Sequence, residues 1–257
     1  IKGLKALGAN ILIQHGSVKA WVANSEKRLR GAKILFNYPS VGATETILMA
    51  ASLAKGTTVI KNAAKEPEIQ DLAKMLNLMG AKIKGAGTSQ IIIEGVNELK
   101  GCKYAVMPDR IEAGTFLIAA AITRSNILVG PVIFNHLESL LIKLEECGCK
   151  LSKEGQFIRI FSKDIKGVNI TTQPYPGFPT DLQAPFMALM TTAKGKSTIS
   201  ETVFENRMQH IEQLTKLGAK IVLDHNVAHI EGVKQLKSNY VQGGDLRSTA
   251  AIILASL

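Results

Sequence analysis

The sequence predicts an α/β fold built from repeats of about 70 residues, and three observations support this prediction. A glycine motif of the form Leu-Gly-Ala-x-Ile, with close variants, occurs four times, and its glycines lie 72, 68 and 70 residues apart at Gly8, Gly80, Gly148 and Gly218. Each copy follows an amphipathic helical pattern and precedes an alternating strand pattern. A second, more apolar helical segment accompanies each copy. Four near-equal copies with one internal order indicate a structural repeat.

Each repeat is expected to read β-α-β-α-β-β. The helix before each glycine has apolar residues at helical spacing, as in Ile69, Leu72, Met75 and Leu76 or in Ile211, Leu214 and Leu217. The glycine itself has the position of a left-handed helix cap. A short alternating strand follows, as at 91–95 and 227–232, and a linker such as 96–101 leads to the next strand.

The second helix of each repeat is apolar nearly all round, at 43–54, 112–122, 182–193 and from 246 onward. A helix without a polar face has no side suited to water, so we expect these helices inside and the sheets outside. Strands at 57–60 and 197–200 connect the two kinds of helix.

Two domains are expected, each incomplete. We predict that residues 1–106 hold the end of one repeat plus one full repeat, and that residues 107–257 hold two full repeats plus the start of another. The chain begins at Ile1 without Met and stops at Leu257 inside an apolar run, which we interpret as a fragment that lacks N-terminal and C-terminal parts.

The composition is that of a soluble globular protein, with 46% apolar and 20% charged residues among 257. No apolar run reaches about 18 residues, so we expect no membrane span and no membrane partner. The net charge of +10 leaves two interpretations open, a solvated lysine-rich surface or an anionic ligand. Few aromatics, and basic residues spread through the linkers, argue against a nucleic-acid partner. Residues 27–30 are interpreted as one such solvated linker.

The cysteines and histidines form no metal-binding pattern. Cys147 and Cys149 have the wrong spacing for a common zinc site, no second pair exists, and an odd count with Cys102 suggests a reducing, cytoplasmic environment. The scattered histidines are interpreted as structural; these are His136, His210, His225 and His229.

The stretch around Asp181 is the first candidate site. Pro174, Pro176 and Pro179 impose an extended, turn-rich approach, after which Thr180 or Asp181 can cap the helix that follows. A carboxylate at a helix start beside a rigid loop is well placed to face a ligand.

The repeat places other residues at the same structural point. Alignment of the copies sets Gly42 opposite Asp181, with Asp109 and Asp245 close to that point. The starts of buried helices offer free N–H groups that suit anionic ligands. These aspartates can equally be plain helix caps, and for Asp109 we favour the cap.

Six motifs carry a resemblance to a known family; they are Ser40–Thr44, Glu66–Ile69, Pro108–Glu112, Phe178–Ala184, Glu201–Arg207 and Asp245–Arg247. Over essentially its whole length the chain resembles the UDP-N-acetylglucosamine 1-carboxyvinyltransferases, a family of enolpyruvyl transferases. The resemblance implies two inside-out α/β barrel domains of three repeats each. It implies transfer of the enolpyruvyl group of phosphoenolpyruvate to the sugar 3-hydroxyl of UDP-N-acetylglucosamine, with release of phosphate, as the first committed step of peptidoglycan synthesis. A monomer without metal or organic cofactor is expected.

The resemblance also implies roles for particular residues. Asp181 matches the general base at the sugar hydroxyl, and a weakly acidic hydroxyl needs such an acceptor as it attacks. Ser40, Val41 and Gly42 match the loop that holds the uridine nucleotide, and Val203 an apolar position against it. Positions near phosphoenolpyruvate and the intermediate are matched by Arg207, Asp245 and Arg247, where arginine forks suit carboxylate and phosphate.

The sequence departs from the family in one respect. An early Lys-Asn pair, a general-acid Cys in a Pro-Gly-Gly context and a late arginine have no counterpart in it, so none of the three cysteines inherits the acid role. We therefore expect the chain by itself to be inactive. Two alternatives stay open, namely enolpyruvyl transfer to shikimate 3-phosphate and a non-catalytic repeat protein that binds a nucleotide sugar.

Overall fold

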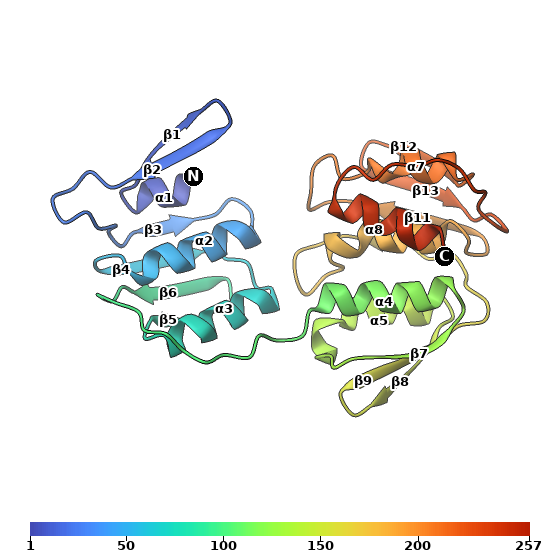
Figure 1. The fold of residues 1–257 in the computed structure, drawn as a ribbon, viewed down its shortest axis with the longest axis horizontal. Coiled ribbons are helices and arrows are strands. Elements are labelled where there is room, and N and C mark those ends of the chain that lie inside the picture. The colour runs from blue at the N-terminus through green and yellow to red at the C-terminus, as the bar shows by residue number, and fades with distance from the viewer. The chain divides into compact units, whose positions relative to one another are not determined.

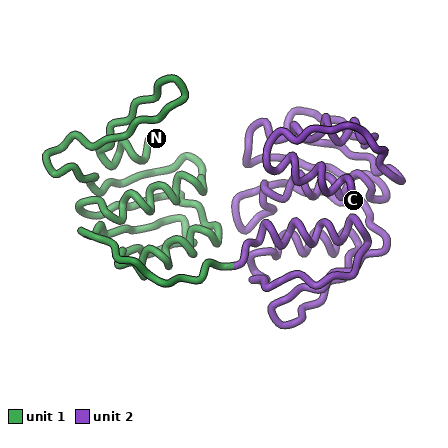
Figure 2. Tube along the Cα trace, viewed as in Figure 1, with its two compact units in different colours: residues 1–107 green, residues 108–257 purple.

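Helices and strands alternate along the whole chain in a computed structural model that describes residues 1–257 (Figure 1). The chain divides into two compact units, Ile1–Met107 and Pro108–Leu257, which are coloured separately in Figure 2. None of the helices has both the length and the apolar character that a membrane crossing requires.

The first unit carries a hairpin and a four-stranded sheet with three helices. Its elements are α1 (Lys2–Ala6), β1 (Asn10–Gln14), β2 (Ser17–Trp21), β3 (Lys33–Leu35), α2 (Val41–Ser52), β4 (Thr57–Lys61), α3 (Pro67–Leu78), β5 (Lys82–Lys84) and β6 (Gln90–Glu94). The strand order of the sheet is β3-β4-β6-β5, in which β3 and β4 are parallel and the other pairs antiparallel. Leu48 of α2 packs in its core with Ile60 and Ile91 of the sheet.

The second unit carries two sheets and most of the helices. Its elements are α4 (Arg110–Ile122), β7 (Asn126–Val129), η1 (Phe134–His136), α5 (Glu138–Glu146), β8 (Lys150–Glu154), β9 (Phe157–Phe161), β10 (Ile170–Thr171), η2 (Thr180–Leu182), α6 (Gln183–Met190), β11 (Lys196–Ser200), α7 (His210–Lys216), β12 (Lys220–Asp224), β13 (Val227–Glu231) and α8 (Leu246–Ala255). The sheets run β7-β9-β8 and β10-β11-β13-β12.

The predicted repeat is present in two complete copies. The series β3-α2-β4-α3-β5-β6 recurs as β10-α6-β11-α7-β12-β13, with the same strand order in both sheets. All four motif glycines lie in the left-handed region, with φ of 91°, 104°, 101° and 90° at Gly8, Gly80, Gly148 and Gly218. The helix-terminating role expected of these glycines is therefore confirmed.

The third copy differs from the prediction, because no strand precedes α4 and its sheet has only three strands. The segment that was expected to form this strand bonds to α3 instead. The Tyr104 hydroxyl donates to Oδ1 of Asp71 at 2.7 Å, and the Met107 N–H donates to Oδ2 at 3.5 Å. Strand β7 is an edge strand of its sheet.

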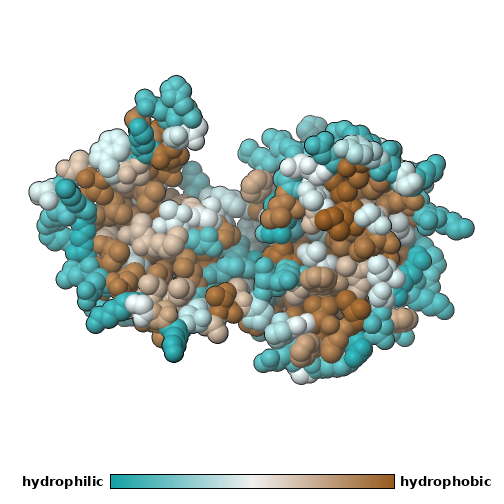
Figure 3. Space-filling view, viewed as in Figure 1, coloured by the Kyte–Doolittle hydropathy of each residue, from teal (hydrophilic) through white to brown (hydrophobic).

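Of the apolar second helices in the second unit, α6 is buried as expected, whereas α4 and α8 each keep an exposed face. Helices α4, α6 and α8 pack against one another (Figure 1), and all eight residues of α6 are buried. Apolar residues also reach the surface of each unit, where they form brown areas in Figure 3. The exposed large apolar side chains include Met49 of α2, Phe116 of α4 and Ile253 of α8.

Two glycines mark the same close approach in the two complete copies. A Cβ placed on Gly95 would lie 1.6 Å from the Ala54 carbonyl oxygen, and one placed on Gly232 would lie 1.6 Å from the Ala193 carbonyl oxygen. No side chain fits at such a distance, so only glycine can occupy the position directly after β6 or β13, where the backbone passes the end of α2 or α6.

The prediction of a solvated linker at 27–30 is wrong for Arg28. Its Nε donates to the Leu53 carbonyl at 2.7 Å and its Nη1 to Oδ1 of Asn97 at 2.8 Å, while Nη2 donates to the Val96 carbonyl. The carbonyls at the C-terminal end of a helix carry partial negative charge and lack partners within the helix, so a guanidinium binds well there.

Candidate active site

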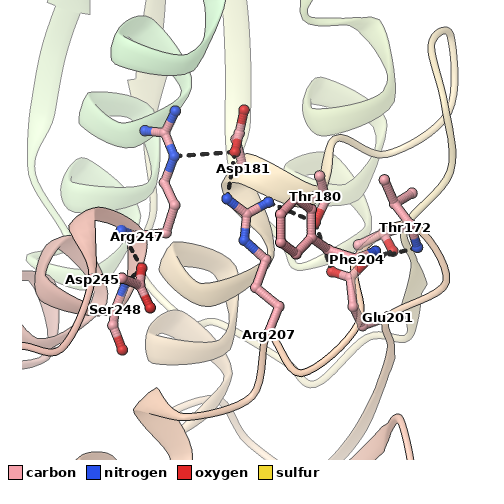
Figure 4. Close-up of polar contacts among 10 residues, drawn as sticks. Thr172, Thr180, Asp181, Glu201, Phe204, Arg207, Asp245, Arg247 and Ser248 are labelled. Carbon is pink, nitrogen blue, oxygen red and sulfur yellow. Dashed lines mark hydrogen bonds and ion pairs between the residues drawn. The ribbon is translucent and has the colours of Figure 1, made fainter. Parts of the chain in front are cut away.

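Three of the predicted residues meet where α6, α7 and α8 begin (Figure 4). Asp181 lies in η2, directly before α6. Arg207 precedes α7, and Arg247 belongs to the first turn of α8. Residues that are far apart in the chain therefore share one end of the buried helix layer of the second unit.

The proline-rich approach turns Asp181 outward by anchoring its neighbours inward. Phe178 packs edge-on against Phe186, with ring centroids 5.3 Å apart, and Leu182 is 1% exposed. The Leu182 N–H donates to the Pro179 carbonyl at 3.0 Å and closes the turn. With both flanks buried, the Asp181 side chain projects from the surface of the unit.

The prediction that Thr180 or Asp181 caps the following helix is wrong. Leu182 occupies the cap position of α6, and no side chain bonds to the first N–H groups of this helix. The reason is the single 3-10 turn Thr180–Leu182 inserted before α6, which directs both polar side chains toward neighbouring loops.

The Asp181 carboxylate is held by one oxygen only. Oδ1 accepts from Nη2 of Arg207 at 2.8 Å and from Nε of Arg247 at 3.1 Å. Oδ2 accepts no hydrogen bond from the protein, and no dashed line reaches it in Figure 4. The side chain is 36% exposed, so this oxygen can accept a proton or a hydrogen bond from a ligand.

The arginines offer donors to an anion. Arg247 uses Nε for Asp181, and neither of its Nη groups bonds to the protein. Arg207 donates from Nη1 to Oγ1 of Thr180 at 2.9 Å and lies over the Phe204 ring, 4.8 Å from its centroid. A fork of this kind fits the oxygens of a carboxylate or phosphate.

Asp245 is the N-cap of α8, which is the plainer of its two predicted interpretations. Its Oδ1 accepts from the Arg247 N–H at 2.8 Å and from the Ser248 N–H at 3.0 Å. The Ser248 N–H, then that of Arg247 and the charge of Arg207 lower the pKa of this carboxyl. The cap thereby fixes the turn that carries Arg247.

Two other aspartate and serine positions are caps as well. Asp109 accepts from the N–H groups of Ile111 and Glu112 at 2.7 and 3.1 Å, which confirms the cap predicted for it. In the first unit Ser40 accepts from the Ala43 N–H at 3.4 Å.

The remaining members of the predicted nucleotide loop follow Ser40 directly. Val41 and Gly42 form the first turn of α2. Gly42 is exposed, with no atom within 4 Å of the position a Cβ would take. The first unit therefore presents an open helix start, and the structure leaves its role as a nucleotide loop a prediction.

Val203 lies on the turn after β11, where its N–H donates to Oε1 of Glu201 at 2.8 Å. Glu201 itself was not singled out from the sequence, although it belongs to one of the family motifs. It is a carboxylate of 2% exposure directly beside the site. A glutamate in a short polar loop gives no sign of burial, because the donors that surround it come from distant segments.

His210 is structural in the sense predicted, since it is 2% exposed at the start of α7. Burial lowers the pKa of its imidazole to about 4, and the charge of Arg207 acts in the same direction. Its Nε2 has no hydrogen-bond partner. The ring is therefore neutral at physiological pH.

The structure offers no set of metal ligands, because no three His, Cys, Asp or Glu side chains lie together in a way that could hold an ion. Cys147 and Cys149 are buried, and burial raises their pKa values to about 12 and about 11. The site is built instead from one carboxylate and two guanidinium groups, a set that suits anionic substrates and proton transfer.

Comparison with known proteins gives the chain a family. The model of the family described as EPSP synthase (3-phosphoshikimate 1-carboxyvinyltransferase) matches residues 1–257. The chain belongs to the EPSP synthase family. Among solved structures of this fold, the enolpyruvyl transferase NikO from Streptomyces tendae has a TM-score of 0.85 at 23% identity and is matched over 99% of this chain and 63% of its own. An EPSP synthase from Acinetobacter baumannii has a TM-score of 0.63 at 22% identity, over 99% of this chain and 62% of its own. The predicted enolpyruvyl transferase fold is confirmed.

The curated relatives in this family carry the name predicted from the motifs. A protein of Prochlorococcus marinus named UDP-N-acetylglucosamine 1-carboxyvinyltransferase 2 is 62% identical over all of this chain and 60% of its own length. A Synechococcus protein named UDP-N-acetylglucosamine 1-carboxyvinyltransferase is 57% identical, again over all of this chain and 60% of its own length. The predicted resemblance is confirmed, and the chain spans less than two thirds of the length of these relatives.

Proposed function

We propose that the full-length protein transfers the enolpyruvyl group of phosphoenolpyruvate to the 3-hydroxyl of UDP-N-acetylglucosamine and releases phosphate. The observation that carries this proposal is the asymmetric Asp181 carboxylate, which has Oδ1 on two arginines and Oδ2 unbonded. The names of the curated relatives support the choice of sugar nucleotide.

Asp181 is the general base in this proposal. Its Oδ2 accepts the proton of the sugar hydroxyl while the hydroxyl oxygen forms a bond to C2 of phosphoenolpyruvate. At the same time a general acid of the full-length protein donates a proton to C3. Loss of a proton from C3 and cleavage of the C2–O bond to phosphate then complete the transfer. The two arginines hold Asp181 in its orientation. General-base catalysis of this kind contributes about 10²- to 10⁴-fold.

Arg207 and Arg247 have a second role toward the anionic substrate. The unbonded Nη groups of Arg247 can donate to the carboxylate or phosphate oxygens of phosphoenolpyruvate without breaking the contact to Asp181. Asp245 acts indirectly, because it holds the turn from which Arg247 projects. In the first unit, Ser40, Val41 and Gly42 are proposed to hold the uridine nucleotide, and Val203 in the second unit to pack against it.

The wider setting of this proposal follows from the reaction. We propose a cytoplasmic monomer without metal or organic cofactor that carries out the first committed step of peptidoglycan synthesis, and thereby serves cell-wall biogenesis, cell shape and cell division. Residues 1–106 and 107–257 are proposed to be parts of its two barrel domains.

Phosphate release by the full-length protein tests the proposal. The protein is incubated with phosphoenolpyruvate and either UDP-N-acetylglucosamine or shikimate 3-phosphate, and we expect release only with the sugar nucleotide. Release only with shikimate 3-phosphate would assign the other transferase activity. Tight binding of the sugar nucleotide without any phosphate release would instead indicate a non-catalytic binding protein.

A further inference from the structure

Glu201 lies behind the candidate site and receives four hydrogen bonds on its buried carboxylate. Oε1 accepts from the Thr172 hydroxyl at 2.7 Å and from the N–H groups of Val203 and Phe204 at 2.8 and 3.0 Å. Oε2 accepts from the Thr180 hydroxyl at 2.8 Å. Four donors converge on two oxygens at 2% exposure, so this carboxylate is fully satisfied inside the protein.

The direction of the bonds through Thr180 is determined by its two partners. A carboxylate only accepts and a guanidinium only donates, so the Thr180 hydroxyl gives its proton to Glu201 and its lone pair to Nη1 of Arg207. Along the chain Glu201–Thr180–Arg207–Asp181, Arg207 therefore donates in both directions: to Asp181, and to Thr180, which in turn donates to Glu201 (Figure 4).

The Arg207 guanidinium contacts three groups, and two of them belong to residues that are hydrogen-bonded to Glu201. These groups are the Thr180 hydroxyl, the Asp181 carboxylate and the Phe204 ring. Glu201 binds the Thr180 hydroxyl through Oε2 and the backbone of Phe204 through Oε1. The buried Glu201 carboxylate thus fixes two of the groups that determine where the Arg207 guanidinium lies and how it is oriented.

We propose that Glu201 is a positioning residue of the transferase, which acts through Thr180 and the Phe204 turn to orient Arg207 against Oδ1 of Asp181. With that contact fixed, Oδ2 of Asp181 is the oxygen left for the sugar hydroxyl. The inference rests on the proposed function for its catalytic consequence, whereas the orientation of Arg207 is independent of it.

Glu201→Gln in the full-length protein is the direct test. Glutamine keeps the shape but has one acceptor oxygen, so its amide nitrogen either faces the Thr180 hydroxyl or meets the three donors at Oε1. In the first position the Thr180 hydroxyl loses its acceptor. In the second position the amide N–H groups oppose the Val203 and Phe204 N–H groups and displace the turn that carries the Phe204 ring. Either way, one of the groups that contact the Arg207 guanidinium is no longer fixed. Because misplacement by about 1 Å costs on the order of 100-fold in rate, we expect kcat to fall by about that factor while KM for the sugar nucleotide changes much less.

Thr172→Val is the matched control. Thr172 is 0% exposed and donates to the same carboxylate, but it does not stand between Glu201 and Arg207. A purely structural role for Glu201 predicts that both variants lower the melting temperature and kcat together. Positioning predicts that both lower the melting temperature and that only Glu201→Gln lowers kcat strongly, so equal losses of kcat would overturn the proposal.

If Glu201→Gln does not fold, substitutions of Thr180 test the same hydrogen-bond chain. Thr180→Val removes the linking hydroxyl, and Thr180→Ser retains it. We expect Thr180→Val to lower kcat to a similar extent and Thr180→Ser to restore it. Where Glu201→Gln does fold, the double variant Glu201→Gln/Thr180→Val should have a kcat no lower than that of the slower single variant. A kcat loss equal to the product of the two single losses would contradict action through Thr180.

The orientation of Arg207 is also measurable without turnover. Hydrogen bonds from both Nη groups slow rotation of the guanidinium, so separate Nη resonances of Arg207 are expected in the NMR spectrum of the wild type, with Arg207→Lys used for assignment. Glu201→Gln should merge them. Unchanged resonances would overturn the positioning role, whereas absence of phosphate release by the wild type would overturn only the proposed function.

Discussion

Arg207 donates from Nη2 to Oδ1 of Asp181 at 2.8 Å, although 26 positions separate the two residues in the chain. Their side chains are 18% and 36% exposed, so the pair is partly screened by solvent. Pairs of this exposure contribute about 0–1 kcal/mol to folding, and the main effect of the contact is therefore on orientation rather than stability. Substitutions in this pair are therefore expected to change turnover more than stability.

Asp181→Asn is expected to lower kcat of the full-length enzyme by about 10²- to 10⁴-fold, because the amide retains the shape of the carboxylate but cannot take the proton of the sugar hydroxyl. The melting temperature should change little, since Asp181 caps no helix. Phosphate release and a thermal melt measure the two quantities.

Asp164→Asn is the control for this substitution. Asp164 forms an exposed ion pair with Lys194 at 2.6 Å in the same unit, away from the site. Turnover of this variant should equal that of the wild type. If Asp181→Asn also keeps wild-type turnover, Asp181 is not the base.

Arg207→Lys should be nearly as harmful as loss of the side chain, although the charge is retained. A lysine has one ammonium nitrogen and no planar fork, so it cannot reproduce the geometry in which Nη1 binds the Thr180 hydroxyl and Nη2 binds Asp181. We expect kcat/KM for phosphoenolpyruvate to fall on the order of 100-fold. Arg159→Lys, at an exposed arginine that bonds Glu154, is the matched control and should leave kcat/KM unchanged; a mild effect of Arg207→Lys would show that charge alone suffices.

The repeat was predictable because its signals are local. A helix period, a glycine in the left-handed region and an alternating strand can each be read within about a dozen residues, and both complete copies follow them. The absence of the strand expected before α4 was not predictable, because this segment instead binds α3, where the Tyr104 hydroxyl donates to Asp71 from 33 positions away. No local pattern around Tyr104 carries that information.

The site was predictable only in part for a related reason. Asp181, Arg207 and Arg247 stand in recognisable motifs, and the structure brings them together. The cap expected at Asp181 fails because one turn of 3-10 helix intervenes, a difference that the preceding prolines do not reveal. Glu201 was missed because its burial depends on donors at Thr172 and Thr180, and a glutamate in a polar loop is ordinarily exposed.

Gly232→Ala should destabilise the second unit far more than Gly195→Ala. The added methyl at Gly232 would lie 1.6 Å from the Ala193 carbonyl oxygen, whereas at Gly195 it would meet no atom within 4 Å. Gly195 has a φ of 97°, so its substitution costs about 1–2 kcal/mol from backbone conformation alone. For Gly232→Ala we expect a loss above about 4 kcal/mol, measured by urea unfolding, and similar losses in the two variants would contradict the close approach.

Buried His210 is expected to make the stability of the second unit depend on pH. The unfolded chain binds a proton on this ring below pH 6.5, whereas the folded protein binds one only below about 4. Between these values protonation favours the unfolded state, so the contribution is fully present above pH 6.5 and is lost as the pH falls toward 4. The pKa difference corresponds to about 3 kcal/mol, which is the change expected in the unfolding free energy of the wild type relative to His210→Asn across this window.

Urea unfolding followed by circular dichroism between pH 4 and 7 measures this dependence. Trp21, the single tryptophan, lies in β2 and reports the first unit, so its fluorescence midpoint should be the same in wild type and variant at every pH. His225→Asn is the second control, because the His225 side chain is 92% exposed. Its replacement should leave the pH dependence of the unfolding free energy unchanged. Parallel stability curves for the wild type and His210→Asn would mean that the imidazole accepts its proton in the folded state as readily as in the unfolded chain.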